Sequence, residues 1–356
     1  MIRRPIRLLF VILVGTVLFL SVSEGRGDNG LAHQAIQIPP ISLGTSGGNI
    51  YDYSRKYCCS GTLGALVQKG SSYYILSNNH VLARSNMGEG GEEIGQPGLI
   101  DYNCGAYQIV AHLSDFVPIS FARRTTNVVD AAIAEIVPWR VKMNGDILDI
   151  GQISGFTIPP TIGLAVQKSG RTTGHTLGII AAIDVTVSVK YTTQCGSRRE
   201  RKATFVNQIL INDAGFSSGG DSGSLVVTQE TTPKALGLLF AGSETATVCN
   251  PIDDVLDALG ISLVGTDSIA GGSSGFSAQM SATEVMVARA VKARHEEAIF
   301  AGHPAVCGVG IGRGADGRAM IQVYAERDLP SVRRAIPHVL EGISVEFIET
   351  GEIIAY

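Results

Sequence analysis

The sequence predicts a mainly β protein that ends in a small α+β region, and two observations carry this prediction. Glycine accounts for 43 of the 356 residues and only 17% of the residues are charged, whereas average soluble chains carry about 25% charge. Short apolar runs alternate with clusters of Gly, Asn, Asp and Ser, a pattern typical of strands joined by tight turns. The composition excludes a disordered chain, which needs low hydrophobicity and high net charge. A helical bundle is also disfavoured, because Gly inside a helix costs about 1 kcal/mol relative to Ala.

Residues 1–23 have the pattern of a signal peptide. Three arginines precede an apolar run over residues 8–20, which is shorter than the roughly 20 residues that a membrane-spanning helix needs. The small residues Ser21 and Ser23 predict cleavage after Ser23; an uncleaved leader, which would be the chain's one contact with a membrane, is the alternative. Because the leader holds three arginines and no acidic residue, its removal changes the net charge from −4 to −7. We expect an exported protein, periplasmic or extracellular, and an acidic chain of this kind does not suit nucleic acid as a partner.

The cysteines fit an exported chain better than a metal site. No two of them form a C-x-x-C pair, so a zinc site is unsupported, and we expect no metal and no cofactor. In an oxidising compartment disulfides become favourable. We expect Cys195 to pair with Cys249, and Cys104 to pair with either Cys58 or Cys59; several free buried thiols are the alternative.

The body of the chain divides into an arm, a β region and a linker. Residues 24–57 are polar and rich in turn residues, and they predict a loosely ordered N-terminal arm. The β region covers residues 58–264, with expected strands at 61–67, 73–77, 131–136, 178–189, 205–211, 224–228 and 235–241. Residues 265–277 are rich in Gly and Ser, which is typical of a flexible linker.

Residues 278–356 predict an α+β accessory domain with the order α-β-β-α-β. Ser281 and Glu284 form a capping box that opens a helix through about residue 301. Strands at 305–312 and 319–325, a short helix at 330–340 and a strand at 343–348 follow. The glycines of residues 308–314 do not form a dinucleotide site, because they lead into a strand and not into a helix N-terminus.

Three residues of the β region fit nucleophilic catalysis on an acyl group. This chemistry needs a hydroxyl, a base within hydrogen-bond reach, and an acid that orients the base. His80 follows an apolar strand, Asp130 begins another, and Ser222 lies in a Gly-Asp-Ser-Gly turn. Gly220 lets this turn bend sharply, so that the N–H groups of Gly220 and Ser222 can face one developing oxyanion. Each motif alone is common in structural roles, but their order and strand context agree.

These motifs resemble those of trypsin-like serine peptidases of the chymotrypsin fold, in which the triad follows the order His, Asp, Ser. The resemblance covers residues 58–264 and rests on LSNNHVL (76–82), DAAIA (130–134), GDSG (220–223) and KSGRTTG (168–174). NNHV and GLLFA (237–241) are similar to the Deg/HtrA branch of bacterial members. QPG (96–98), LSDFVPI (113–119) and VNQI (206–209) are similar to bacterial relatives of the plant NARROW LEAF 1 group. The resemblance implies a chymotrypsin-like double antiparallel β-barrel.

Carried over residue by residue, the resemblance implies a role for each site residue. Ser222 would be the nucleophile, His80 the general base and Asp130 the orienting acid, and the amides of Gly220 and Ser222 would form the oxyanion hole. The base of the substrate pocket would be Phe216, which disfavours a preference for Lys or Arg. Walls from Leu239, Phe240, Ala241 and Gly242 suggest a shallow apolar pocket for a small or aliphatic side chain.

The chain departs from the animal digestive members of the family in its activation. No sequence like Arg-Ile-Val-Gly-Gly precedes Cys58, so a newly cut N-terminal ammonium is not expected to pair with Asp221. We expect a local Ser, Thr or backbone partner for Asp221 instead.

The sequence as a whole therefore favours an exported serine endopeptidase that acts on protein or peptide substrates. A non-catalytic peptide-binding or scaffold protein on the same fold is the competing interpretation, because fold alone does not determine function. The accessory domain leaves three roles open, namely substrate recruitment, homo-oligomerisation and autoinhibition.

Overall fold

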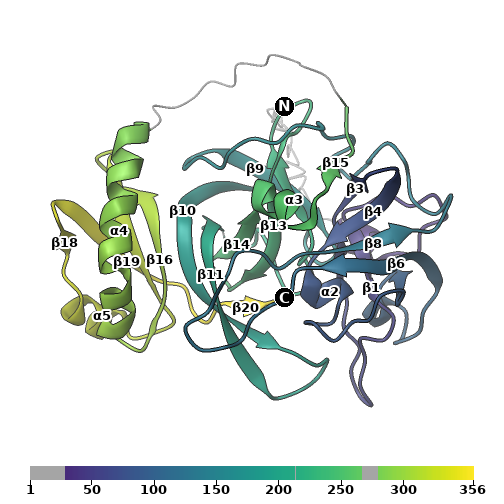
Figure 1. Ribbon diagram of the computed structural model, residues 1–356, viewed down its shortest axis with the longest axis horizontal. Coiled ribbons are helices and arrows are strands. Elements are labelled where there is room, and N and C mark those ends of the chain that lie inside the picture. Colours follow the sequence, from purple (N-terminus) through teal and green to yellow (C-terminus); the bar gives the residue numbers. More distant parts are fainter. Residues whose placement is uncertain (1–28, 213, 267–279) are drawn as a thin grey trace, which may run out of the picture.

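The computed structural model describes residues 29–212, 214–266 and 280–356. The predicted leader and most of the predicted linker lie outside these residues. None of the described helices is long and apolar enough to cross a membrane. Figure 1 shows two β-rich parts side by side, with a helix-covered sheet beyond the second of them.

The first sheet carries the N-terminal half of the β region. Its strands, in spatial order, are β15 (Ser262–Leu263), β3 (Ala65–Lys69), β4 (Ser72–Ser77), β8 (Ala132–Ile136), β6 (Gln108–Phe116), β5 (Glu93–Gln96), β1 (Thr45–Asn49) and β2 (Gly61–Leu63). The helix α2 (Asn79–Leu82) and the 3₁₀ turn η1 (Leu99–Asp101) belong to the same half, whereas α1 (Asn29–Gln34) contacts strands of both sheets. Neighbouring residues on both faces of these strands, such as Leu66, Ile75 and Ile133, are fully buried.

The second sheet contains a ring of strands that closes on itself. The order β10 (Gly174–Thr192), β9 (Ala165–Gly170), β12 (Leu225–Thr228), β13 (Ala235–Gly242), β14 (Thr247–Pro251), β11 (Glu200–Ile211) returns to β10, because β10 also pairs with β11. A two-residue strand, β7 (Thr126–Asn127), lies beside β11, and α3 (Ile252–Leu259) follows β14. Closure of the ring leaves no free strand edge within it.

The accessory region extends this second sheet. After α4 (Ala282–Gly302) come β16 (Val306–Arg313), β17 (Ala319–Ala325), α5 (Leu329–Ala335), β18 (Val339–Leu340), β19 (Ile343–Glu349) and β20 (Ile354–Ala355). The predicted capping box is confirmed, since Glu284 N donates to Ser281 Oγ at 3.2 Å and Ser281 N donates to Glu284 Oε2 at 3.1 Å. β16 pairs antiparallel with β10, for example Val187 with Gly308, so the accessory sheet and the ring of strands are hydrogen-bonded to one another.

Two expectations about the N-terminal half are corrected. Residues 41–49 of the predicted arm are buried, and β1 pairs with β2 and β5. Residues 45–49 of the arm thus form a strand of the first sheet, because their small side chains fit between two neighbouring strands. The pairing of Cys195 with Cys249 is wrong. Cys195 bonds to Cys59, across 136 residues of sequence, while Cys249 points from β14 into the buried core as a free thiol.

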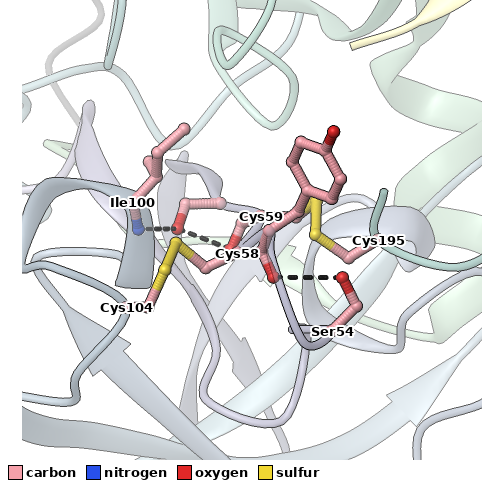
Figure 2. Close-up of a disulfide and its surroundings, with 8 residues drawn as sticks. Ser54, Cys58, Cys59, Ile100, Cys104 and Cys195 are labelled. Atoms are coloured by element: carbon pink, nitrogen blue, oxygen red, sulfur yellow. Dashed lines mark hydrogen bonds between the residues drawn. A yellow bond between two sulfur atoms is a disulfide. The ribbon is translucent and has the colours of Figure 1, made fainter. Parts of the chain in front are cut away.

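The other predicted disulfide is confirmed in one of its two alternatives, since Cys104 bonds to Cys58. Figure 2 shows both disulfides side by side at the segment that leads into β2. Cys195 lies in the turn between β10 and β11, so the second disulfide ties the tip of this hairpin to the first half of the molecule. In the chain-entropy view such long closures contribute about 2–5 kcal/mol to stability.

Candidate active site

His80 and Asp130 are brought together by the pairing of β4 with β8. Ser77 at the end of β4 lies opposite Ala132 at the start of β8, so the residues just beyond each strand end meet. His80 lies in the short helix α2, and its Nδ1 is 2.6 Å from Asp130 Oδ2. The backbone N–H of His80 donates to Asp130 Oδ1 at 3.2 Å. Both oxygens of the carboxylate therefore face the histidine.

The carboxylate, the carbonyl and the N–H of Asp130 each have a further hydrogen-bond partner. It is fully buried, and its Oδ2 also accepts from the hydroxyl of Tyr191 on β10 at 2.8 Å. Asn78 Nδ2 donates to the Asp130 carbonyl at 2.7 Å, and the Asp130 N–H donates to Asn250 Oδ1 at 3.0 Å. Asn78 thus explains one position of the NNHV motif. Tyr191 was missed by sequence reasoning, because nothing in the local pattern of β10 distinguishes it.

The charge of Asp130 governs the protonation of His80. Burial of the imidazole lowers its pKa, but the nearby Asp130 carboxylate, together with its hydrogen bond and one from the Tyr356 carbonyl, outweighs burial and raises the pKa above the ordinary value of 6.5. The second ring nitrogen, Nε2, lies 2.8 Å from the Tyr356 carbonyl oxygen. Because Asp130 and Tyr356 both present acceptors, each ring nitrogen must donate a proton, and His80 in this state is an imidazolium.

Ser222 lies in a tight loop that only glycine permits. Gly220 and Gly223 on either side have φ angles of +99° and +95°, which side chains other than glycine rarely adopt. A Cβ on Gly220 would also lie 2.5 Å from Thr172 Oγ1. Ser222 Oγ donates to the carbonyl of Phe240 at 2.9 Å, instead of donating to His80.

The carbonyls of this loop are fixed, and their fixation orients the amides. Gly219 O accepts from Thr172 Oγ1 at 2.6 Å. In a trans peptide the C=O and the next N–H point in opposite directions, so the N–H of Gly220 points away from Thr172. Thr62 on β2 holds two more groups, since its Oγ1 donates to Gly220 O at 2.9 Å and its N–H donates to Ser222 O at 2.8 Å. The first half of the molecule thereby shapes the loop carried by the second.

We expect Thr62→Val to slow acyl transfer without preventing folding. Valine keeps the shape and the backbone N–H but loses the hydroxyl that holds Gly220 O, so Gly220, whose N–H is one of the two proposed oxyanion donors, loses one of its anchors. Removing one oxyanion donor typically lowers kcat by about 10²–10³-fold. Partial displacement of such a donor in Thr62→Val should therefore lower kcat by about 10- to 100-fold, with a smaller effect on KM. Steady-state kinetics on a peptide substrate measure this, and Thr62→Ser, which keeps the hydroxyl, is the control. An unchanged kcat in Thr62→Val would show that Thr62 does not position the loop.

Asp221 finds local partners, as predicted, and one buried cation as well. Its carboxylate accepts from the backbone N–H groups of Thr172, Thr173 and Ser218 at 2.8, 3.1 and 2.9 Å, and from Thr173 Oγ1 at 2.7 Å. Lys168 Nζ lies 3.6 Å from Asp221 Oδ2, and both side chains are fully buried. Burial lowers the pKa of Lys168 to about 8, although Asp221 opposes this shift. The positive charge beside Asp221 thus comes from the side chain of Lys168 and not from a newly cut N-terminal ammonium.

The predicted pocket residues divide into two groups. Phe216 and Leu239 are buried in the cluster against which Tyr356 packs. The side chains of Phe240 and Ala241 belong to a different cluster, on the Tyr191 side, so Phe240 faces the site only through its carbonyl. Gly242 lies directly beside the Tyr356 ring, since a Cβ on Gly242 would be 2.8 Å from Tyr356 Cζ.

A cleft of about 240 Å³ opens beside His80, and it is also lined by Gly219, Gly220, Arg171 and Tyr356. Asp52 lies on its wall with Cys59 and Cys195, and burial raises the pKa of Asp52 to about 6. These three residues are close enough to resemble a metal cluster, but the two sulfurs form a disulfide, so neither is available as the thiolate that a metal would bind.

Comparisons with known proteins give no family for the whole chain. No protein-family model matches the sequence, and no curated protein matches it. Among solved structures, one is described as a glutamic-acid-specific serine protease with a histidine triad in substrate binding; it is 19% identical, with a TM-score of 0.43, and the match covers 63% of this chain and all of that chain. Thermobifida fusca protease A is 19% identical (TM-score 0.43, 64% and 99% covered). Cellulomonas bogoriensis chymotrypsin is 17% identical (TM-score 0.41, 64% and 99% covered).

The structure itself confirms the predicted fold class. The described residues are mainly β, with His80 and Asp130 just outside strands β4 and β8 of the first sheet and Ser222 in the loop before β12 of the second, and an α+β region follows. This is the arrangement of the chymotrypsin fold. The finer resemblance to the Deg/HtrA branch and to the NARROW LEAF 1 group stays a prediction from sequence.

Proposed function

We propose that this protein is an exported serine endopeptidase, in which Ser222 is the nucleophile, His80 the general base and Asp130 the orienting acid. One observation carries the proposal. His80 contacts Asp130 Oδ2 with Nδ1 and the main-chain oxygen of Tyr356 with Nε2. The amide of the same residue donates to Phe240 O at 3.4 Å, the atom that also accepts from Ser222 Oγ. Main-chain atoms of Tyr356 thus contact both the proposed base and the carbonyl oxygen to which the proposed nucleophile donates.

The reaction follows from these roles when a substrate occupies the cleft and His80 is neutral. Ser222 Oγ attacks the carbonyl carbon and its proton passes to His80 Nε2, while the N–H groups of Gly220 and Ser222 stabilise the oxyanion. His80 then gives the proton to the departing amine as the C–N bond breaks. Water, activated by the same imidazole, releases the acid from Ser222. Asp130 stabilises the imidazolium throughout and takes no proton.

The two disulfides of the structure and the predicted leader of the sequence support export. The two disulfides, Cys58–Cys104 and Cys59–Cys195, suit an oxidising compartment, and the predicted leader would direct the chain there. The substrates are accordingly proteins or peptides outside the cytoplasm. Self-association of the chain stays an expectation from sequence.

A fluorophosphonate probe tests the proposal directly, because it forms a covalent bond only with an activated serine. We expect the folded parent chain to be labelled at Ser222, as peptide mapping would locate, and Ser222→Ala to remain unlabelled. Equal labelling of the two proteins would contradict the assignment. Ser71→Ala is a matched control, since it removes an exposed hydroxyl in a turn outside the candidate site.

A non-catalytic peptide-binding protein is the second candidate, and one observation favours it. Ser222 Oγ donates to Phe240 O and not to His80, while a peptide segment contacts the histidine. A binding protein would retain peptides without cleaving them. Stable peptide binding, with neither labelling nor product in any variant of the chain, would support this alternative.

A further inference from the structure

The segment that follows β19 enters the candidate active site. Tyr356 lies 276 residues away from His80 in sequence, yet the two are hydrogen-bonded. β20 runs antiparallel to β13, with Ala355 opposite Ala241 and Ile354 opposite Gly242. On its other side β20 pairs with β10, where Lys190 N donates to Ile353 O at 2.9 Å. Figure 1 shows β20 leaving the accessory region and reaching between the second barrel and α2.

The backbone of Tyr356 makes contacts that we would expect from the substrate residue just before the scissile bond. Its N–H donates to Phe240 O at 3.4 Å and its carbonyl oxygen accepts from His80 Nε2 at 2.8 Å. With Nε2 donating a proton to this oxygen, His80 has no lone pair for the proton of Ser222. The segment therefore blocks the cleft and also holds the base in its inactive protonation state.

The side chain of Tyr356 fills a pocket that is built for a ring. Its hydroxyl donates to the Ser243 carbonyl at 2.9 Å. The ring packs against the cluster of Phe216 and Leu239. Beside the ring lies an open cleft, which Tyr356 itself lines together with residues 217–219, 243–245, 349–352 and 354. A Cβ at position 242 would collide with the Tyr356 hydroxyl and lie 2.6 Å from Ala246 O. Glycine at 242 thus leaves the pocket open to an aromatic side chain.

We propose that residues 353–356 are an internal peptide ligand of the substrate cleft, which keeps the site closed, and that substrates carry an aromatic residue at the position of Tyr356, directly before the scissile bond. The proposal rests on the proposed endopeptidase function. It replaces the expectation that the substrate carries a small or aliphatic side chain at this position. That expectation rested on the apolar wall residues alone and did not include the space that Gly242 leaves for a ring. It also selects autoinhibition among the roles left open for the accessory region.

The expected strength of inhibition follows from tethering. A ligand on the same chain is present at an effective concentration on the order of millimolar, so even a short peptide of modest affinity keeps most of the molecules closed. Substrate in trans must compete with this segment. Weakening the segment should therefore raise kcat/KM for a peptide substrate by about 10- to 100-fold, corresponding to about 1.4–2.8 kcal/mol.

The first test compares the parent chain with Tyr356→Ala, which removes the ring from the pocket. We expect Tyr356→Ala to cleave a substrate ending in Ile-Ile-Ala-Tyr-p-nitroanilide, and to react with the fluorophosphonate probe, about 10- to 100-fold faster than the parent chain. Tyr107→Ala, which changes an exposed tyrosine on the first half, is the matched control and should equal the parent. Equal rates for Tyr356→Ala and the parent would overturn the internal-ligand proposal while leaving the endopeptidase assignment intact.

The second test supplies the segment as a separate peptide and does not depend on how the variant folds. The peptide Gly-Glu-Ile-Ile-Ala-Tyr should compete with substrate for Tyr356→Ala, whereas Gly-Glu-Ile-Ile-Ala-Asp should not. The substrate with Tyr before the scissile bond should exceed its Ala counterpart by at least about tenfold in kcat/KM. A preference for Ala would overturn the aromatic assignment. Absence of labelling and cleavage in every variant, Tyr356→Ala included, would instead contradict the proposed function.

Discussion

Asp130→Asn is expected to lower kcat for peptide hydrolysis by about four orders of magnitude. The carboxylate accepts two hydrogen bonds at Oδ2, from His80 Nδ1 at 2.6 Å and from the Tyr191 hydroxyl at 2.8 Å. An amide in this place can turn its NH₂ group toward His80, which then accepts at Nδ1 and carries its proton on Nε2. That tautomer cannot receive the proton of Ser222, and the imidazolium that forms during the reaction loses its counter-charge.

The measurement is kcat for a peptide substrate, with each variant compared in the same Tyr356→Ala background so that the internal segment does not limit the rate. Asp115→Asn is the matched control, because Asp115 is an exposed partner of Lys69 at 3.2 Å and lies outside the triad. We expect this control to retain the parent rate. A near-normal rate for Asp130→Asn, or a large loss for Asp115→Asn, would contradict the assignment of Asp130 as the orienting acid.

Local patterns were enough to predict the parts of the site that depend on neighbouring residues. The apolar run at 73–77 followed by NNHV predicts His80 just after a strand, and His80 lies in α2 directly after β4. The Gly-Asp-Ser-Gly turn is visible because its φ angles require glycine at 220 and 223. The capping box at Ser281 is equally local.

Long-range contacts could not be predicted in this way, because no local pattern encodes which distant segments meet. The bond between Cys59 and Cys195 depends on how far the β10–β11 hairpin reaches. Tyr191 contacts Asp130 only because of the same hairpin, and Thr62 reaches Gly220 from a different barrel. The contact of Tyr356 with His80 requires the accessory sheet to join β10 first. Each of these depends on tertiary arrangement and not on residue type.

Lys168→Met is expected to destabilise the protein by about 3–5 kcal/mol, because it removes one partner of a buried ion pair and leaves the other charge uncompensated. Lys168 Nζ also donates to Gly174 O at 2.8 Å and to Thr173 Oγ1, so methionine leaves these acceptors with one donor fewer. Denaturant unfolding in a Ser222→Ala background, which prevents self-digestion, measures the free energy of unfolding. Lys234→Met, which breaks a partly exposed pair with Glu230 at 3.3 Å, is the control and should cost no more than about 1 kcal/mol.

The effect of Lys168 should extend from stability to catalysis, because Asp221 lies between the two residues whose amides form the proposed oxyanion hole. Its carboxylate joins the strand turn at residues 172–173 to the loop at Ser218, and an unbalanced charge there favours exposure of Asp221 to water, which pulls the loop open. The double variant Lys168→Met/Asp221→Asn separates the two contributions. It should recover part of the lost stability, since no buried charge remains, but not the lost activity, since an amide cannot accept four hydrogen bonds as the carboxylate does. A loss below about 1 kcal/mol for Lys168→Met would instead show that the amide and hydroxyl donors around Asp221 balance its charge without the lysine.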